Sequence, residues 1–128
     1  MDWLTWIIIG GAVGAFLVLK RLTLVTPEVA RDRLNQGAKV IDVRSDGEYQ
    51  ERHLPGALNI PLDRLRDEIT RFATDREQPL LLHCLSGTRS GMGKAMLKKM
   101  GYRNVFNLGS YGRAGKILAA HSQARKKH

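Results

Sequence analysis

The sequence predicts an α/β domain, a parallel sheet covered by helices on both faces, preceded by one transmembrane helix. Short β-branched or leucine-rich runs alternate with segments in which apolar residues recur at helical spacing, and strands that alternate with helices pair in parallel. An uncharged apolar run near the N-terminus predicts the membrane helix. The 128 residues therefore divide into an anchor with its juxtamembrane segment over residues 1–25, a domain over 26–120 and a basic tail over 121–128.

The membrane anchor is predicted from residues 3–19, which carry no charge. These 17 residues are at the short end of what spans a bilayer as a helix, where about 20 are typical. Trp3 and Trp6 lie near one end of the run, as in the aromatic belt of a spanning helix. A cleaved secretory signal is the alternative, but it would carry positive charge before the apolar run, and here Asp2 precedes it.

Lys20 and Arg21 follow the apolar run and predict its orientation, because positive flanks stay on the cytoplasmic side. We therefore expect a single-pass membrane protein with Met1 outside and the folded domain in the cytoplasm. Gly10 and Gly14 have the spacing that lets two helices approach closely, which indicates a homodimer. Glycine is also frequent in spanning helices that do not associate.

The first elements of the domain are a helix and a buried strand. Thr26 is a good N-cap, Pro27 suits the first helical position, and Gly37 ends the helix. The β-branched residues within 39–43 then predict a buried strand. The further elements expected in chain order are a short helix capped by Ser45, a strand over 58–60, an amphipathic helix over 62–72, a strand over 80–83, a helix closed by Gly101, a strand over 104–108 and a last helix through Leu118.

Charge and cysteine content exclude several classes of function. A single cysteine excludes an internal disulfide framework and a multi-cysteine zinc site, and the four histidines have no ligand spacing, so we expect neither metal nor cofactor. The net charge is +9, yet no aromatic platform or recognition motif accompanies it, so nucleic acid is not an expected partner. Five basic and no acidic residues follow Gly112, and this segment would either rest on anionic lipid or be a solvated terminus.

A reactive site is predicted at the end of the strand over 80–83, because ligands of open α/β sheets bind outside the carboxyl ends of strands. Cys84 stands at this end, and Gly87 lets the following loop turn backbone N–H groups inward as a nest for an anion. The helix that starts near Ser90 and the cation of Arg89 add positive potential. Such surroundings lower the pKa of a cysteine, so we expect a reactive thiol with an anionic substrate rather than an inert core cysteine.

Four separated motifs resemble the rhodanese family in their order and spacing. They are Asp42-Val43-Arg44, Glu48-Tyr49, the run from His53 to Pro61, and His83-Cys84 with its loop, within a match from about Thr26 to about Tyr111. The resemblance implies a sulfurtransferase fold in which Cys84 carries sulfane sulfur as a persulfide. The sulfur would pass from a small donor such as thiosulfate to a thiol or cyanide acceptor.

The resemblance also implies roles for individual residues. The amides of an active-site loop would hold the persulfide and the anionic donor, and its last residue would orient an oxyanion; the loop residues are Leu85, Ser86, Gly87, Thr88 and Arg89. Asp42 and Arg44 would be structural support, the first as a local cap or loop anchor and the second as a salt-bridge partner. His53 and His83 are also expected to be structural, and His83 should face away from Cys84 because neighbouring strand residues point to opposite faces.

Loop length separates two related chemistries. The spacing from Cys84 to Arg89 is Cys-x4-Arg, whereas related phosphatases use Cys-x5-Arg, which makes room for phosphate. The shorter loop favours sulfur transfer. Two positions depart from the family pattern, since Ser110 stands where a second glycine is usual and Ala114 where tryptophan is usual. The alternative function is a non-catalytic rhodanese-like module that recruits partners at the membrane, although such modules commonly lose the cysteine that is present here.

Overall fold

The computed structural model describes residues 2–127, without the side chains of residues 20–22. Its elements in chain order are α1 (Trp3–Leu22), α2 (Pro27–Asn35), β1 (Lys39–Asp42), α3 (Asp46–Glu51), β2 (Leu58–Asn59), α4 (Leu62–Phe72), β3 (Leu80–His83), α5 (Thr88–Lys99), β4 (Val105–Gly109) and α6 (Tyr111–Lys126). The strands and helices predicted for the domain are confirmed. Their ends differ from expectation by a few residues, because caps and turns rather than periodicity set them.

The sheet has the strand order β2-β1-β3-β4, and all neighbouring strands are parallel. Leu82 of β3 lies opposite Ile41 of β1 and Asn107 of β4. The register then shifts, so that His83 lies opposite Gly109 and β4 holds one extra residue at this point. The predicted parallel sheet is confirmed, and β3 at its centre delivers the chain to the predicted reactive loop.

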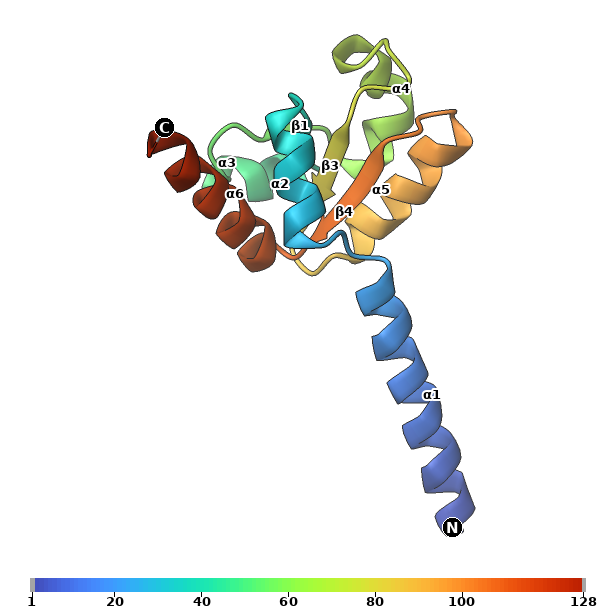
Figure 1. Cartoon of the computed structure of the whole chain (residues 1–128). Coiled ribbons are helices and arrows are strands. Elements are labelled where there is room, and N and C mark those ends of the chain that lie inside the picture. The colour runs from blue at the N-terminus through green and yellow to red at the C-terminus, as the bar shows by residue number, and fades with distance from the viewer. Residues whose placement is uncertain (1, 128) are drawn as a thin grey trace.

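Helices cover both faces of the sheet (Figure 1). One core lies beneath α4 and α5, and its fully buried members include Ile41, Leu65, Leu82, Cys84 and Leu97. The other lies beneath α2 and α6, and its buried members include Ala30, Val40, Leu81, Ala114 and Ile117. Because successive strand residues face opposite sides, β3 contributes to both cores and places Cys84 on the α5 side.

Polar caps set where α2 and α3 begin. The hydroxyl of Thr26 accepts a hydrogen bond from the N–H of Val29 at 3.3 Å. Ser45 and Glu48 form a capping box: the Ser45 hydroxyl accepts from the N–H of Glu48, and the Glu48 carboxylate accepts from the N–H of Ser45, both at 3.2 Å. This cap holds the Glu48 carboxylate at the start of α3, close enough to α5 for a second contact.

Helix α1 extends away from the sheet with its apolar side chains exposed (Figure 1). Within the part of the chain that the structure describes, no helix is long and apolar enough to cross a membrane. The predicted transmembrane anchor is therefore wrong, and so is the single-pass location with a cytoplasmic domain. The physical reason is length, since 17 uncharged residues rise only about 25 Å as a helix against about 30 Å of hydrocarbon. The side chains of Lys20 and Arg21, on which the predicted flanking roles depend, are outside what the structure describes, and so is Met1.

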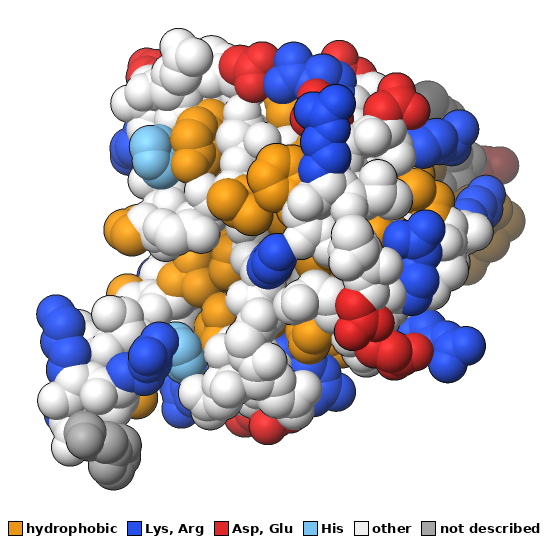
Figure 2. Space-filling view, turned by 90° about the horizontal axis from the view of Figure 1, so that it is seen from above, with side chains coloured by type: hydrophobic (Ala, Val, Ile, Leu, Met, Phe, Trp, Pro, Cys, Tyr) orange, Lys and Arg blue, Asp and Glu red, His pale blue; other side chains and the backbone are white. Residues whose placement is uncertain are grey.

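The last helix, α6, runs without a break through residue 120, where the sequence predicted the boundary between domain and tail. His121 on this helix donates from Nε2 to Oδ1 of Asn35 at 3.0 Å, which joins α6 to the end of α2. Figure 2 shows the end of α6 protruding, with Lys and Arg side chains on it. The division at residue 120 stays a prediction, and His128 lies outside the described residues.

Candidate active site

Cys84 follows β3 at the carboxyl end of the sheet. Its backbone N–H donates to the carbonyl of Gly109 in β4 at 3.2 Å, which ties the start of the loop to the sheet. Its side chain is fully buried, in the core beneath α5. Residues 85–87 then lead directly into α5, which begins at Thr88. The strand end, the loop and the helix start predicted from the sequence thus lie together in the structure.

Hydrogen-bond donors surround the sulfur of Cys84. The backbone N–H of Gly87 lies 3.0 Å from Sγ, and the N–H of Ser90 lies 3.5 Å from it. The hydroxyl of Ser90 is also 3.5 Å from Sγ. Gly87 is the N-cap of α5 and provides no side-chain cap, so the N–H groups of the first turn need another acceptor. The sulfur serves as that acceptor, at the end of the helix where negative charge is favoured.

Gly87 has the backbone conformation that this arrangement requires. Its φ is 96°, in the left-handed region that glycine adopts without strain. A Cβ at this position would lie 3.2 Å from Cα of Gly109, which is backbone of β4 and has little freedom to move aside. The glycine predicted for the nest is therefore needed twice, for its φ and for the close approach of β4.

Two opposing effects act on the pKa of Cys84. Burial raises it, because a thiolate in the core loses its hydration, whereas hydrogen bonds from the Ser90 hydroxyl and from the N–H groups of Ser90, Gly87 and Ser86 lower it. The hydrogen bonds prevail, and the pKa of the thiol lies below its ordinary value. A lowered pKa is the direction expected for a reactive thiol, and the reactivity of Cys84 itself stays a prediction.

A buried amide, Asn107 of β4, joins the loop to the helix. Its Oδ1 accepts from Oγ of Ser90 at 2.7 Å and from the N–H of Gly109 at 2.8 Å, and its Nδ2 donates to the carbonyl of Gly87 at 3.1 Å. From the sequence, Ser90 is predicted only as a helix start, and Asn107 only as a residue of the last strand. An amide in the middle of an apolar strand was the available signal, because a buried polar side chain needs partners.

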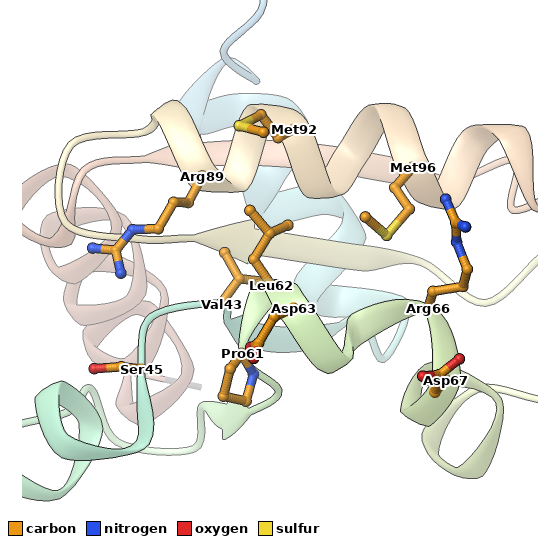
Figure 3. A pocket seen from close by; sticks show the side chains of 10 residues that line it. All are labelled: Val43, Ser45, Pro61, Leu62, Asp63, Arg66, Asp67, Arg89, Met92 and Met96. Carbon is orange, nitrogen blue, oxygen red and sulfur yellow. The ribbon is translucent and has the colours of Figure 1, made fainter.

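Arg89 extends from the start of α5 towards the segment that carries Ser45 (Figure 3). Its guanidinium binds both carboxylate oxygens of Glu48, at 2.7 and 3.1 Å. These hydrogen bonds hold the pKa of Glu48 down, at about 2. The predicted oxyanion ligand is thus bound to a carboxylate 41 residues away in the sequence. Spacing within the loop motif gives no sign of such a long-range partner.

Asp42 and Arg44 form a buried ion pair at the end of β1. The Arg44 guanidinium donates from Nη2 to Oδ2 of Asp42 at 2.8 Å and from Nε to both oxygens at 3.0 Å. Oδ1 of Asp42 also accepts the backbone N–H of Arg44 at 2.9 Å. Arg44 reaches further, to the carbonyl of Arg52 at 2.7 Å. Asp42 thus accepts both a local backbone N–H and the guanidinium of Arg44, and Arg44 joins β1 to the end of α3.

His83 faces the opposite side of the sheet from Cys84. Its ring is fully buried, with Nε2 3.9 Å from Oδ2 of Asp42 and its centroid 6.1 Å from that of Tyr111. Burial lowers the pKa of His83 and outweighs the attraction of Asp42, so the ring is neutral at neutral pH. Its Nε2 is buried with no hydrogen-bond partner among the described residues.

Three other singled-out residues have structural contacts. His53 donates from Nδ1 to the carbonyl of Tyr49 at 2.9 Å and stacks on its ring at 3.9 Å between centroids. Ser110 caps α6 by accepting the N–H of Arg113 at 3.1 Å. Ala114 is fully buried in the core beneath α2 and α6. The two departures from the family pattern are therefore a helix cap and a small core residue.

A hollow of about 690 Å³ adjoins the loop between α4 and α5 (Figure 3). Apolar side chains and charged side chains line it together; they include Val43, Leu62, Met92, Met96, Asp63, Arg66, Asp67 and Arg89. Because Arg89, in the first turn of α5 just after the loop, forms part of this wall, a molecule bound in the hollow would lie beside the loop.

Comparisons with known proteins agree with this geometry. Residues 26–112 match the family described as Rhodanese-like domain. The chain is 39% identical over 69 residues to thiosulfate sulfurtransferase PspE of Escherichia coli (strain K12), covering 54% of this chain and 66% of that protein. It is 31% identical over 84 residues to thiosulfate sulfurtransferase GlpE of Pseudomonas fluorescens (strain SBW25), covering 66% of this chain and 75% of that protein.

A solved structure described as a rhodanese with anions from E. coli has the same fold. Its TM-score is 0.58 at 36% sequence identity, over 59% of this chain and 89% of that one. The chain spans just under two thirds of the length of PspE. The family match itself covers more than half of the chain and includes the whole sheet with the loop after β3. The chain therefore belongs to the rhodanese-like domain family, among whose members are sulfurtransferases.

Proposed function

We propose that this chain is a sulfurtransferase in which Cys84 carries sulfane sulfur as a persulfide, from a donor such as thiosulfate to a thiol or cyanide acceptor. The observation that carries the proposal is the set of donors on the buried sulfur. The N–H of Gly87 and the N–H and hydroxyl of Ser90 lie within 3.5 Å of it. Such donors stabilise anionic sulfur. The relatives named thiosulfate sulfurtransferases support the same chemistry.

In the first half of the reaction, the Cys84 thiolate attacks the outer sulfur of thiosulfate. A new S–S bond forms to Cys84, the S–S bond of thiosulfate breaks, and sulfite leaves with the electron pair. Backbone amides of the loop from Leu85 to Thr88 hold the anion as a nest, and the N-terminal end of α5 favours its negative charge. The product is a persulfide on Cys84.

In the second half, a thiolate or cyanide attacks the outer sulfur of the persulfide. The S–S bond to Cys84 breaks, and Cys84 leaves as a thiolate that the same donors stabilise. The hollow between α4 and α5 provides space for the acceptor beside the loop. Cys84 is the catalytic residue, and the chain returns to its starting state.

We assign Arg89, Asp42 and Arg44 supporting roles. Arg89 holds the start of α5 against α3 through Glu48, and its charge adds to the positive potential around the loop. Asp42 and Arg44 hold the end of β1 next to the loop. In this assignment the backbone amides of the loop contact the anion directly, and the guanidinium of Arg89 does not.

The homodimer expected through Gly10 and Gly14 stays a prediction. A Cβ built on either glycine has no atom within 4 Å, apart from neighbours in its own helix, so this face of α1 is open to a second copy. Sedimentation of the full chain tests it. A dimer that dissociates in Gly14→Leu supports the contact, and a monomer at all concentrations contradicts it.

Incubation of the purified chain with thiosulfate tests the proposed function. Mass spectrometry should show one added sulfur atom on Cys84, which cyanide should remove as thiocyanate. Cys84→Ser should take up no sulfur while its circular dichroism spectrum stays the same, because a hydroxyl is far less nucleophilic at neutral pH. A Cys84 that accepts sulfur from neither thiosulfate nor a small persulfide would favour the non-catalytic interaction module.

A further inference from the structure

The hydroxyl of Ser90 has two acceptors but only one proton. Its Oγ lies 2.7 Å from Oδ1 of Asn107 and 3.5 Å from Sγ of Cys84. All three side chains are buried, so each bond forms within the core. Because a hydroxyl carries a single O–H, Ser90 can donate fully to only one of the two acceptors at a time.

The amide of Asn107 is fixed in one orientation by two other hydrogen bonds. Its Nδ2 donates to the carbonyl of Gly87, and its Oδ1 accepts the N–H of Gly109. The reversed orientation would set N–H against N–H and oxygen against oxygen, so it is excluded. Oδ1 therefore always faces Ser90, and it keeps the bond from Gly109 when Ser90 donates elsewhere.

We propose that Ser90 is a two-position donor that follows the charge of Cys84. While the sulfur is a neutral thiol, the hydroxyl donates to Asn107, and its lone pair can accept the S–H. When the sulfur becomes a thiolate, its proton leaves to water and the hydroxyl turns to donate to the sulfur. Ser90 keeps its own proton throughout. Ser90 is then a catalytic residue, because it touches the reacting atom, and Asn107 is a positioning residue.

This donor has its clearest use in the second half of sulfur transfer, and that use rests on the proposed function. As the S–S bond of the persulfide breaks, the electron pair arrives on Sγ of Cys84. The N–H donors of Gly87 and Ser90 are fixed in the backbone and cannot change partner. Of the donors described around this sulfur, the Ser90 hydroxyl is the one that can turn towards the new charge.

The charged and titratable side chains described next either bind partners other than Cys84 or face away from it. Arg89 on α5 is bound to Glu48 on α3, and Asp42 on β1 is bound to Arg44. The ring of His83 faces the other side of the sheet, towards Tyr111 of α6. The side chains that α4 contributes to the core around Cys84 are apolar. None of these groups is altered in the variants below.

The test titrates the thiol by its ultraviolet absorbance, with the Cys84→Ser chain as the blank; the chain has a single cysteine, so the signal has one source. Ser90→Ala removes the donor while Asn107 keeps its bond from Gly109, so the chain should fold. The pKa of Cys84 should rise by about 1. Ser90→Thr retains a hydroxyl and should bring the pKa back.

Ser86→Ala is the matched control. It removes a hydroxyl from the same loop, but one that lies 3.4 Å from Oγ1 of Thr88 rather than against the sulfur. Its backbone N–H stays in place. The pKa of Cys84 should therefore be the same as in the unaltered chain.

Asn107→Asp makes the test specific to a donor with two positions. A carboxylate would hold the Ser90 proton and also repel the thiolate, so the pKa of Cys84 should rise further than in Ser90→Ala. When Ser90→Ala is added to this chain, there is no hydroxyl proton for the carboxylate to hold. The pKa of Cys84 in the double variant should therefore equal its pKa in Asn107→Asp alone. The proposal would be overturned if the pKa increases of the two single variants add up in the double variant. It would also be overturned if the pKa of Cys84 is unchanged in Ser90→Ala.

The titration needs no sulfur donor, so it is independent of the proposed activity. A chain that titrates as expected but takes up no sulfur would refute the proposed function alone. A chain that transfers sulfur but shows additive increments would refute the role of Ser90 alone.

Discussion

His83 and Cys84 are neighbours in the chain, both fully buried and both titratable, yet their surroundings are opposite. The sulfur of Cys84 receives hydrogen bonds from Gly87 and Ser90, whereas Nε2 of His83 has no hydrogen-bond partner among the described residues. Burial acts against the charged form of either side chain. Local donors, and not the position at the end of a strand, therefore decide whether the pKa shift of a buried group favours its charged or its neutral form.

The two faces of β3 produce this difference. Cys84 points to the N-terminal end of α5, where N–H groups lack partners within the helix. His83 points to the other face, where Arg44 already binds both oxygens of Asp42. The guanidinium carbon of Arg44 also lies 4.8 Å from the ring centroid of Tyr111. The carboxylate nearest to His83 is therefore already compensated, and the imidazole gains little by charging.

Arg44→Ala should have the largest effect, because Arg44 is the partner of the carboxylate beside His83. It leaves the Asp42 carboxylate buried without its partner, 3.9 Å from Nε2 of His83. We expect the free energy of unfolding to fall by about 3–5 kcal/mol and the pKa of His83 to rise. Urea unfolding and an NMR titration of the imidazole measure the two effects.

The control for that variant is Arg64→Ala, which breaks an exposed pair with Asp46. An exposed pair contributes little, so the loss should be below about 1 kcal/mol. Equal losses in the two variants would contradict the importance of burial for the pair of Asp42 and Arg44.

Gly87→Ala should disturb the loop that donates to the sulfur of Cys84. The left-handed φ and the close approach of Gly109 should cost about 1–3 kcal/mol of unfolding free energy. Displacement of the Gly87 N–H should also raise the pKa of the thiol. Denaturant unfolding and the ultraviolet titration measure both. Gly112→Ala, at an open helical position, should instead leave the stability equal or higher.

A fall in pH should lower the stability of the folded chain through His83. Burial lowers the pKa of this residue in the folded chain, so between its folded pKa and the ordinary value of about 6.5 the unfolded chain binds more protons. Stability should therefore fall as the pH drops below about 6.5 and be unaffected by this group above it. His83→Leu should remove more of this pH dependence than His121→Gln, whose side chain lies nearer the surface. Thermal unfolding of the unaltered chain and of the two variants across a pH series measures this dependence.

Glu48→Gln should have the smallest effect, because its pair with Arg89 is partly exposed. The expected loss is at most about 1 kcal/mol, and it applies only where Glu48 is ionised. Since the pKa of Glu48 is lowered from 4.5 to about 2, the contribution of the pair should disappear as the pH falls between these values. Acid unfolding of the two chains should converge below that range. A tighter binding of thiosulfate in Glu48→Gln would instead assign Arg89 to the anion.

The prediction of a reactive site at Cys84 rests on contiguous signals: a buried strand, then Gly87, then a helix start. Contiguous signals could not predict the partners of this loop, because those partners are distant in the sequence. Arg89 meets Glu48 across 41 residues and Ser90 meets Asn107 across 17, and only the fold brings these pairs together. Helix α1 shows the opposite error, since a local apolar pattern of marginal length was interpreted as a membrane span.

Cys84 is the single thiol of the chain, and its sulfur is enclosed by the loop and α5. No second cysteine in the same chain can resolve a sulfur species formed on it into a disulfide. A direct disulfide between two folded copies would need the two sulfurs about 2.0 Å apart, and in each copy the Cys84 side chain is fully buried. In the proposed reaction the chain therefore has a capacity of one sulfur atom, which it must hand to a separate molecule before it can take the next.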